Sequence, residues 1–473
     1  MNVRPSRSRR GTLAIGLAVA LVATIATSLA GSASATERTA IAHHAGGKVV
    51  ATKTSARPRL YNIGHHAGEP TIGFSRDGKL FYTAGAGCVT SCTGDPAMLE
   101  TVTPGGRAVM MTPDNGKTWV NVSPGLPDQG ASPHVTSLDP MLFVDHNSDT
   151  DRVFDIDLNA ACSILSYSDD HGQTWITNPL ACGEPVNDHQ TLFSGKPTTS
   201  AGLTPLYGKV LYYCYNKLAY TKCSKSLDGG VTFIDTTGLN NPECSGLNGH
   251  GVTDSKGTIF LPYTGCNNAP AVAVSKDEGN TWEILKVPGE KVNGGDPSVA
   301  VDRKDNLYFM WHDVDRHVRL ATSKNHGKTW SKPLDVTMPG VKLTDLATLT
   351  VGAPGKVAFA YLGTTSDEKK AFWNGYLGYS TDVFAKNPVF VSASINDPGH
   401  PLKATGGNNT PCGPGRCGRI LDFLDVEISP TTGQPWGAYV DACQATCEKT
   451  GVETYADNEG MAGAFVGAPR LNK

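Results

Sequence analysis

The chain has 473 residues, with 53 glycines, 30 prolines and a formal net charge of −3. This glycine and proline content punctuates turns and works against long helices, so we expect a mostly β protein. The charges are spread along the chain, which excludes the basic patch of a nucleic-acid-binding protein and a polybasic membrane-binding segment. Length alone predicts two or three domains, but a chain built from repeats can form one.

The N-terminus has the pattern of an export signal. Four arginines within the first ten residues precede an apolar stretch from Leu13 to about Ala30, and Ala33-Ser34-Ala35 then has the small-x-small form of a cleavage site. A membrane anchor is the alternative, but the small residues after the apolar stretch argue against it. The sequence therefore predicts a signal peptide at 1–35 and a secreted, extracellular protein. No later segment is apolar for long enough to span a bilayer.

The twelve cysteines fall into pairs that are close in the sequence. The pairs are Cys88 with Cys92, Cys162 with Cys182, Cys214 with Cys223, Cys244 with Cys266, Cys412 with Cys417, and Cys443 with Cys447. An even number of cysteines in a secreted chain indicates disulfides, and we expect each pair to close a local loop. Zinc binding by the two C-x3-C pairs is the alternative, but it leaves most of the cysteines without a role.

An eight-residue motif recurs at intervals of roughly fifty residues. Its five good copies are Thr112–Trp119, Ser168–Trp175, Ser226–Phe233, Ser275–Trp282 and Ser323–Trp330, and Ser380-Thr-Asp382 is a degenerate sixth. The consensus, S/T-x-D-x-G-x-T-W/F, resembles the Asp-box (BNR) repeat of sialidase-like β-propellers. The Asp can accept backbone N–H bonds in a tight turn, the Gly supplies a positive φ, and the aromatic residue packs between sheets. These Asp residues are therefore expected to be structural and not catalytic.

A second repeat, of strand, turn and strand, precedes each motif and occurs once more after the last one. The clearest copies begin at Glu69, Asp139 and Asp296, and the last covers Leu424 to Tyr439. Seven such units predict an all-β, seven-bladed β-propeller of four-stranded antiparallel sheets. Six blades, as in catalytic sialidase domains, is the alternative and would leave one unit outside the ring.

The predicted organisation is a signal peptide at 1–35, a flexible N-terminal segment at 36–56 and a propeller at 57–473. The last blade lacks a motif of its own. Its third strand is expected at Met461–Val466, and its fourth at Lys48–Thr52 or Arg59–Ile63 near the mature N-terminus. Pairing the two ends of the chain would close the ring and remove exposed sheet edges.

Resemblance to sialidase-like propellers implies a site on the axis, where the innermost strands begin. Aligning the units places polar residues there, namely Glu69, Asp139, Asp188, Asn248, Asp296, Asp345 and either Asp422 or Asp425, with His250 two positions after Asn248. We expect Glu69, Asp139 and Asp296 to be catalytic, and Asp188, Asn248, His250, Asp345 and Arg316 to bind substrate. The alternative for any one of them is capping of local backbone. A crowded ring of carboxylates can bind a divalent cation or keep one carboxyl protonated, and no other cofactor is expected.

The pattern of a catalytic sialidase is not matched. The arginine that opens the first blade in that family is absent, because the aligned stretch here is Gly68-Glu69-Pro70. Arg316, Arg319 and Arg419 could cluster, but nothing fixes them as a carboxylate-binding triad. The expected function is hydrolysis of extracellular glycans by carboxylate acid/base chemistry. A non-catalytic propeller that binds glycan or protein is the alternative, and an exo-sialidase or polysaccharide lyase is less favoured. The expected partner is extracellular carbohydrate, and the mature chain is expected to be a monomer.

Overall fold

The computed structural model describes residues 38–473. Its gaps are 66, 86–106, 125–139, 147–149, 160–161, 179–186, 199–204, 218–219, 242, 245–246, 294, 367–370, 405–421, 445 and 452–457. The predicted signal peptide, Asp139 and Arg419 lie outside the described residues.

Five of the cysteines also lie outside the described residues: Cys88, Cys92, Cys182, Cys412 and Cys417. The disulfides predicted between Cys88 and Cys92, between Cys162 and Cys182, and between Cys412 and Cys417 therefore stay predictions.

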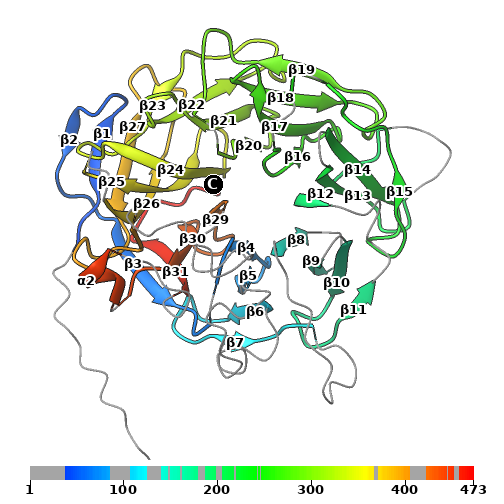
Figure 1. Ribbon diagram of the computed structural model, residues 1–473, viewed down its shortest axis with the longest axis horizontal. Helices are drawn as coiled ribbons and strands as arrows, with labels where there is room; N and C mark the ends of the chain where they lie inside the picture. Colours follow the sequence, from blue (N-terminus) through cyan, green and yellow to red (C-terminus); the bar gives the residue numbers. More distant parts are fainter. Residues whose placement is uncertain are drawn as a thin grey trace, which may run out of the picture. The chain divides into compact units, whose positions relative to one another are not determined.

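The described strands form seven antiparallel sheets, which follow one another around a ring (Figure 1). The first sheet has β4 (Thr71–Phe74), β5 (Leu80–Gly85), β6 (Arg107–Thr112) and β7 (Val120–Asn121). The second has β8 (Pro140–His146), β9 (Asp151–Asn159), β10 (Cys162–Ser168) and β11 (Ile176–Asn178). The third has β12 (Asp188–Gly195), β13 (Val210–Lys217), β14 (Tyr220–Ser226) and β15 (Ile234–Asp235).

The remaining sheets repeat this order from the axis to the rim. The fourth has β16 (Val252–Thr253), β17 (Ile259–Cys266), β18 (Ala269–Ser275) and β19 (Glu283–Lys286). The fifth has β20 (Ser298–Val301), β21 (Leu307–His312), β22 (Val318–Ser323) and β23 (Leu334–Asp335). The sixth has β24 (Leu343–Val351), β25 (Val357–Thr364), β26 (Phe372–Ser380) and β27 (Val389–Ser394), with β28 (Lys403–Ala404) paired to β26.

The seventh sheet joins the two ends of the chain. It has β29 (Asp425–Ile428), β30 (Pro435–Asp441) and β31 (Glu459–Val466), and its fourth strand is β3 (Arg57–Asn62), which pairs with β31 in register from Arg57↔Val466 to Asn62↔Met461. This confirms the predicted closure, and of the two N-terminal segments that the sequence left open it is the later one that pairs. The chain is therefore an all-β propeller of four-stranded antiparallel sheets, as the sequence predicts.

The N-terminal segment at 36–56, which the sequence analysis expects to be flexible, contains two strands. Within it, β1 (Ile41–His44) pairs with β27 and β2 (Val49–Ala51) pairs with β1, so they extend the sixth sheet outward. His43 is fully buried, and its Nε2 lies 3.1 Å from the Ser392 hydroxyl. The reason is that β27, the outer strand of the sixth sheet, offers a long edge for pairing. It has six residues, whereas the fourth strands of the first five sheets have two to four.

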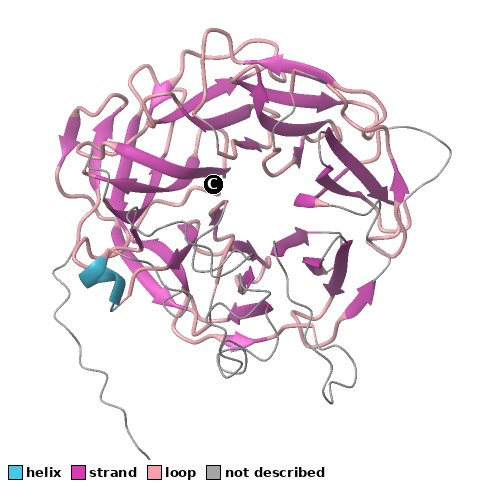
Figure 2. Ribbon diagram, viewed as in Figure 1, coloured by secondary structure: helices cyan, strands magenta, loops and turns pink. Residues whose placement is uncertain are grey.

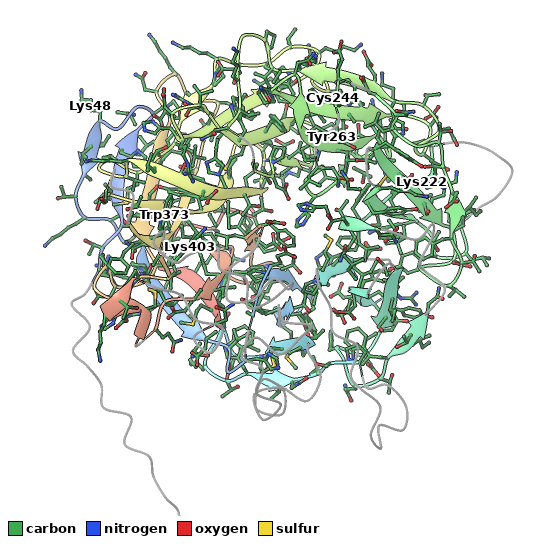
Figure 3. The ribbon with its side chains drawn as sticks, viewed as in Figure 1. Lys48, Lys222, Cys244, Tyr263, Trp373 and Lys403 are labelled. Carbon is green, nitrogen blue, oxygen red and sulfur yellow. A yellow bond between two sulfur atoms is a disulfide. The ribbon has the colours of Figure 1, made fainter. Side chains whose placement is uncertain are left out.

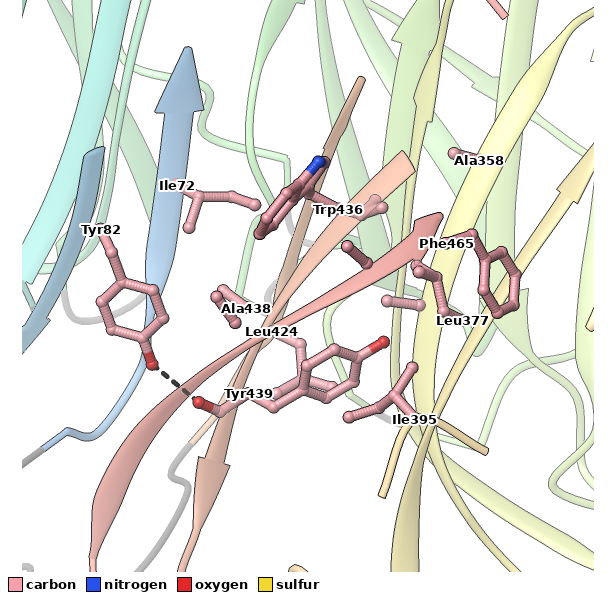
Figure 4. Close-up of a cluster of buried hydrophobic side chains, with 14 of the residues drawn as sticks. Ile72, Tyr82, Ala358, Leu377, Ile395, Leu424, Trp436, Ala438, Tyr439 and Phe465 are labelled. Carbon is pink, nitrogen blue, oxygen red and sulfur yellow. Dashed lines mark hydrogen bonds between the residues drawn. The ribbon is translucent and has the colours of Figure 1, made fainter. Parts of the chain in front are cut away.

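Burial follows position within each sheet. Second strands such as β21 and β25 are buried along their whole length because neighbouring sheets cover both of their faces. One such packing region joins the first, sixth and seventh sheets around Tyr82, Leu377 and Tyr439, and the Tyr82 hydroxyl donates to the Tyr439 carbonyl at 2.7 Å (Figure 4). Figure 2 shows how little helix accompanies the strands; the described residues include the short helix α2 (Thr446–Thr450).

The repeated motif lies in the turn between the third and fourth strands. In the third copy, Asp228 Oδ1 accepts the Val231 and Thr232 N–H groups at 3.1 and 2.9 Å, and Oδ2 accepts the Thr232 hydroxyl at 2.6 Å. Gly230 has φ of 98° and donates its N–H to the Ser226 hydroxyl at 2.8 Å. The first, second and fourth copies repeat these Asp contacts with Thr118, Thr174 and Thr281. The Asp side chain therefore fixes the turn between the two outer strands of each of these sheets.

Three predicted disulfides are confirmed: Cys214–Cys223, Cys244–Cys266 and Cys443–Cys447. The first links cross-strand partners on β13 and β14, and the second spans an isolated bridge beside β17. Across the ranges that the structure describes, no helix is both long and apolar enough to cross a membrane.

Candidate functional site at the mouth of the axis

His189 is the centre of a charged cluster where the innermost strands begin. Its Nδ1 lies 3.1 Å from Asp296 Oδ2, and its Nε2 lies 3.3 Å from Asp422 Oδ2. The side chain is 3% exposed, and burial alone would disfavour its charge. The two carboxylates, Asp296 first, outweigh that cost and raise the pKa of His189 to about 11. His189 is therefore an imidazolium that connects the third, fifth and seventh sheets.

A distortion at the start of β12 gives His189 this position. Its φ is 49°, and the pairing of β12 with β13 shifts register between Asp188 and Thr191. The same irregularity occurs in β24, where Leu346 has φ of 52° and the register shifts between Asp345 and Thr348. Such a bulge redirects a side chain at the end of a strand.

Two further acids support the cluster, Glu69 through Asp422 and Asp188 beside His189. Glu69 is 1% exposed, and its Oε1 accepts the Asp422 N–H at 3.2 Å, so it holds the backbone of Asp422. Asp188 contributes negative charge near His189 while its Oδ1 accepts the His189 N–H at 3.1 Å. Asp422 is the open member of the cluster, with its side chain 42% exposed.

Asn248 and His250 form the wall beside this cluster. Asn248 Oδ1 accepts the Thr221 hydroxyl at 3.0 Å, and its Nδ2 donates to the His189 carbonyl at 3.4 Å. The His250 ring lies edge-on to Phe423, 4.9 Å between centroids. Burial, together with the nearby charge of His189, lowers the pKa of His250 to about 4, so this ring is neutral. The Gly249 backbone presses against Pro297, leaving no room for a side chain.

Asp345 and Arg316 form a separate group from His189. Arg316 Nη2 and Lys403 Nζ lie 3.4 and 3.6 Å from Asp345 Oδ2. The expectation of one continuous acidic ring is therefore wrong at this point, because the bulge in β24 places Leu346, and not Asp345, against the mouth. Asp139 lies outside the described residues.

Asp425 belongs to a different ring, made of hydrogen bonds between neighbouring innermost strands. The hydroxyls of Thr71, Thr191 and Ser298 accept N–H groups from the next sheet, at Leu142, Gly251 and Leu349. Asp425 Oδ2 accepts the Ile72 N–H in the same way at 2.9 Å. Of the two acids that the sequence left open, Asp422 is thus the one in the His189 cluster.

The alignment missed His189 itself, although its position directly after Asp188 was a signal.

Two cavities follow the axis. The one at the mouth is small, about 20 Å³, and is lined by His250, Asp296, Leu346, Asp422 and Phe423, among others. Behind it the innermost strands of all seven sheets line a cavity of about 540 Å³. Asp425 and Glu427 border this cavity, and burial raises their pKa values to about 7 and about 8. The described residues contain no group of three or more His, Cys, Asp and Glu side chains able to hold a metal ion.

No protein-family model matches the chain, and no curated protein matches it. Solved structures similar to it include a protein of unknown function from Dyadobacter fermentans, 12% identical, with a TM-score of 0.39 and coverage of 86% of this chain and 97% of that chain. NanB sialidase from Streptococcus pneumoniae is 11% identical, with a TM-score of 0.42 and coverage of 71% and 69%. A six-bladed β-propeller lectin from Aleuria aurantia is 10% identical, with a TM-score of 0.42 and coverage of 72% and 97%. The fold assignment rests on the strand pairing given above.

Proposed function

We propose that this chain is a secreted carbohydrate-binding propeller and that the mouth of its axis holds a sugar residue without a negative charge. The observation that supports this is the half-exposed carboxylate of Asp422, held from behind by the His189 imidazolium and the Glu69 side chain. A carboxylate fixed in this way is an acceptor ready for sugar hydroxyls, because its own orientation costs no further ordering.

Charge selects against acidic sugars at this position. Three acids, Asp188, Asp296 and Asp422, act on the one imidazolium, that of His189. The described arginines Arg316 and Arg319 are engaged elsewhere, with Asp345 and Asp313. Among the described residues that line the mouth, a sialic acid carboxylate would meet Asp296 and Asp422 and no guanidinium, so this described geometry does not favour sialidase activity.

Binding is favoured over hydrolysis because the mouth is narrow. Phe423 and His250 line it and pack against each other, and the cavity that they border, about 20 Å³, holds a water molecule but no sugar ring. A ligand would therefore lie over the mouth and not descend between two carboxyls.

Glycoside hydrolysis is the second candidate, and one observation favours it. Burial raises the pKa of Asp296 even though His189 opposes that shift, while Asp422 across the imidazole is far more exposed. Two carboxyls in unlike environments can divide the roles of acid and base. In this candidate Asp296 would be the acid, and Glu69 would position Asp422.

A glycan array of plant, fungal and host glycans, probed with the wild-type protein and two variants, tests the proposal. We expect Asp422→Asn to weaken binding about tenfold, the effect of losing one charge-assisted hydrogen bond. The matched control is Asp382→Asn, in the degenerate motif. Among the described residues, the hydrogen bond that its carboxylate accepts is the one from the Phe384 N–H to Oδ1. Absence of binding to every glycan, or equal binding by Asp422→Asn, would overturn the proposal. Release of reducing sugar by the wild type and not by Asp296→Asn would establish hydrolysis instead.

We also propose that each of the seven sheets is one blade and that the repeated turns are Asp boxes. The order of the sheets around the ring supports the first statement, and the Asp-centred hydrogen bonds support the second. Three local disulfides support export to an oxidising compartment.

Peptide mapping under non-reducing conditions checks the three disulfides that stay predictions. We expect fragments that link Cys88 to Cys92, Cys162 to Cys182, and Cys412 to Cys417. A link between distant sheets, or a free thiol at Cys92, Cys182 or Cys417, would contradict local pairing.

A further inference from the structure

A group of charged side chains surrounds Trp373 on the outer side of the mouth. The guanidinium carbon of Arg316 lies 5.2 Å from the centre of the Trp373 ring, and Lys403 Nζ lies 5.9 Å from it. Trp373 itself is 3% exposed, and Figure 3 shows it beside Lys403. Asp345 completes the group, which we call the Trp373 platform: Arg316, Asp345, Trp373 and Lys403.

Four separate elements build the platform. Arg316 lies in the turn between β21 and β22, Asp345 in β24, Trp373 at the start of β26 and Lys403 in β28, directly across from Trp373. All of these positions are at the end of the propeller where the innermost strands begin. Arg316 is fixed there, because its Nε donates to the Thr344 carbonyl at 3.3 Å and its φ is 60°.

The platform has one more positive than negative charge among the described residues. Two cations share Asp345, and both N···O distances, 3.4 and 3.6 Å, exceed those of a good charge-assisted hydrogen bond. The Arg316 turn has two more acids: Asp313, whose Oδ2 accepts from Arg319 Nε at 2.6 Å, and the exposed Asp315, whose N–H donates to Asp313 Oδ1 at 3.0 Å. His312 lies behind and adds no charge, because burial lowers its pKa to about 4. Arg316 and Lys403 are 35% and 25% exposed, so a ligand can reach them.

The platform adjoins the mouth through one short segment. Asp345 directly precedes Leu346 and Ala347, which line the mouth cavity. His312 fixes this segment, since its Nε2 accepts the Ala347 N–H at 2.9 Å and its Nδ1 lies 2.9 Å from the Thr344 hydroxyl. A chain of sugars lying over the mouth would therefore extend onto the platform.

We propose that the Trp373 platform is a second subsite, which binds an oxyanion, carboxylate or sulfate, on the glycan whose neutral residue lies over the mouth. This inference rests on the proposed carbohydrate binding. It specifies the ligand as a glycan in which a neutral sugar is next to an acidic one. The oxyanion accepts hydrogen bonds from Arg316 and Lys403, whose cations Trp373 already stabilises through its ring face.

The test is an array of glycans in matched sets that differ only in one substituent: neutral, uronate and sulfated. It is probed with the wild type, Lys403→Gln and a control, Lys324→Gln. Lys324 also lies over an aromatic ring, 4.5 Å from that of Phe384, but in a motif turn at the opposite end of the propeller. Titrations of the best acidic glycan and its neutral counterpart then give dissociation constants at low and moderate salt.

We expect the wild type to bind acidic glycans more tightly than their neutral counterparts. In Lys403→Gln the affinity for acidic glycans should fall about tenfold, and the affinity for neutral glycans should change little. Lys324→Gln should match the wild type, and added salt should reduce the preference. Comparison of uronate with sulfated members shows which oxyanion is bound. Equal binding of acidic and neutral members, or an unchanged preference in Lys403→Gln, overturns this inference and leaves the proposed function standing. Failure of the wild type to bind any glycan overturns both.

Discussion

The imidazole of His189 has a carboxylate oxygen within 3.3 Å of each ring nitrogen, and this contact governs the chemistry of the mouth. The charged ring is nearly inaccessible to solvent, so it serves to hold Asp422 and Asp296 in place. Removing one member of such a buried ionic group leaves uncompensated charge, which is more costly than losing a surface pair.

The first prediction concerns the pH dependence of stability. The pKa of His189 is about 11 in the folded chain, against an ordinary value of 6.5, so its contribution to the free energy of unfolding is complete below about pH 6.5 and is lost as the pH rises towards 11. Chemical denaturation should therefore show wild-type stability falling between about pH 7 and pH 10, with a flatter profile for His189→Gln. His171→Gln is the control, because Asp77 Oδ1 lies 3.8 Å from His171 Nε2, too far for a good hydrogen bond. Parallel profiles for wild type and His189→Gln would show that His189 is neutral.

At the scale of single elements, the turns and the innermost strands play opposite roles. The motif turns hold the rim by bonds within a few residues, whereas strands such as β29 place ionisable groups along the axis. Asp425 and Glu427 alternate with apolar residues on β29 and so share a direction, towards the cavity.

The second prediction concerns a motif turn. Asp228→Ala removes four hydrogen bonds from the turn after β14, and we expect a loss of about 1 to 2 kcal/mol in the free energy of unfolding, since the turn is partly exposed. Asp382→Ala, in the degenerate motif, should cost less because Asp382 Oδ1 accepts the Phe384 N–H without the Thr contacts of the full motif. Urea titrations of both variants measure the difference, and equal losses would contradict the structural role of the full motif.

The third prediction concerns Glu427. Burial, and then the charge of Asp425, raise its pKa to about 8 from an ordinary 4.5, so the folded chain holds a proton that the unfolded chain releases in this range. Ionising Glu427 destabilises the folded state increasingly as the pH rises from 4.5 to 8. Glu427→Gln should therefore raise the melting temperature at about pH 8 and change it little at about pH 5. An equal change at both pH values would mean that Glu427 does not titrate in this window.

At the scale of the whole molecule, the ring depends on β3. This strand makes six residue pairs with β31, and without it the seventh sheet would end in an open edge next to the first sheet. By contrast, β1 and β2 extend a sheet that already has four strands of its own, so the ring is closed without them.

The fourth prediction compares two deletions. Removal of residues 57–62 should prevent formation of a stable monomer, whereas removal of 41–51 should leave a folded protein with a lower melting temperature. Size-exclusion chromatography and thermal unfolding distinguish these outcomes. A folded monomer without residues 57–62 would show that the seventh sheet tolerates three strands.

The sequence alone determined the features that depend on residues close together in the chain. The motif turns, the strand pattern and the local disulfides at Cys214, Cys244 and Cys443 are of this kind, since each is specified within a few tens of residues. Closure by an N-terminal segment could also be anticipated, because a ring with one incomplete sheet needs a strand, although the sequence left open whether Lys48–Thr52 or Arg59–Ile63 supplies it.

Only the tertiary structure decided which acids meet. The bulges before Thr191 and Thr348 insert a residue into the register, so a position counted along the sequence no longer predicts where a side chain points. His189 thereby reaches Asp296 and Asp422, which are far from it in the chain, while Asp345 turns instead to Arg316 and Lys403. Contacts across the axis depend on how three sheets face one another, and no local pattern encodes that geometry.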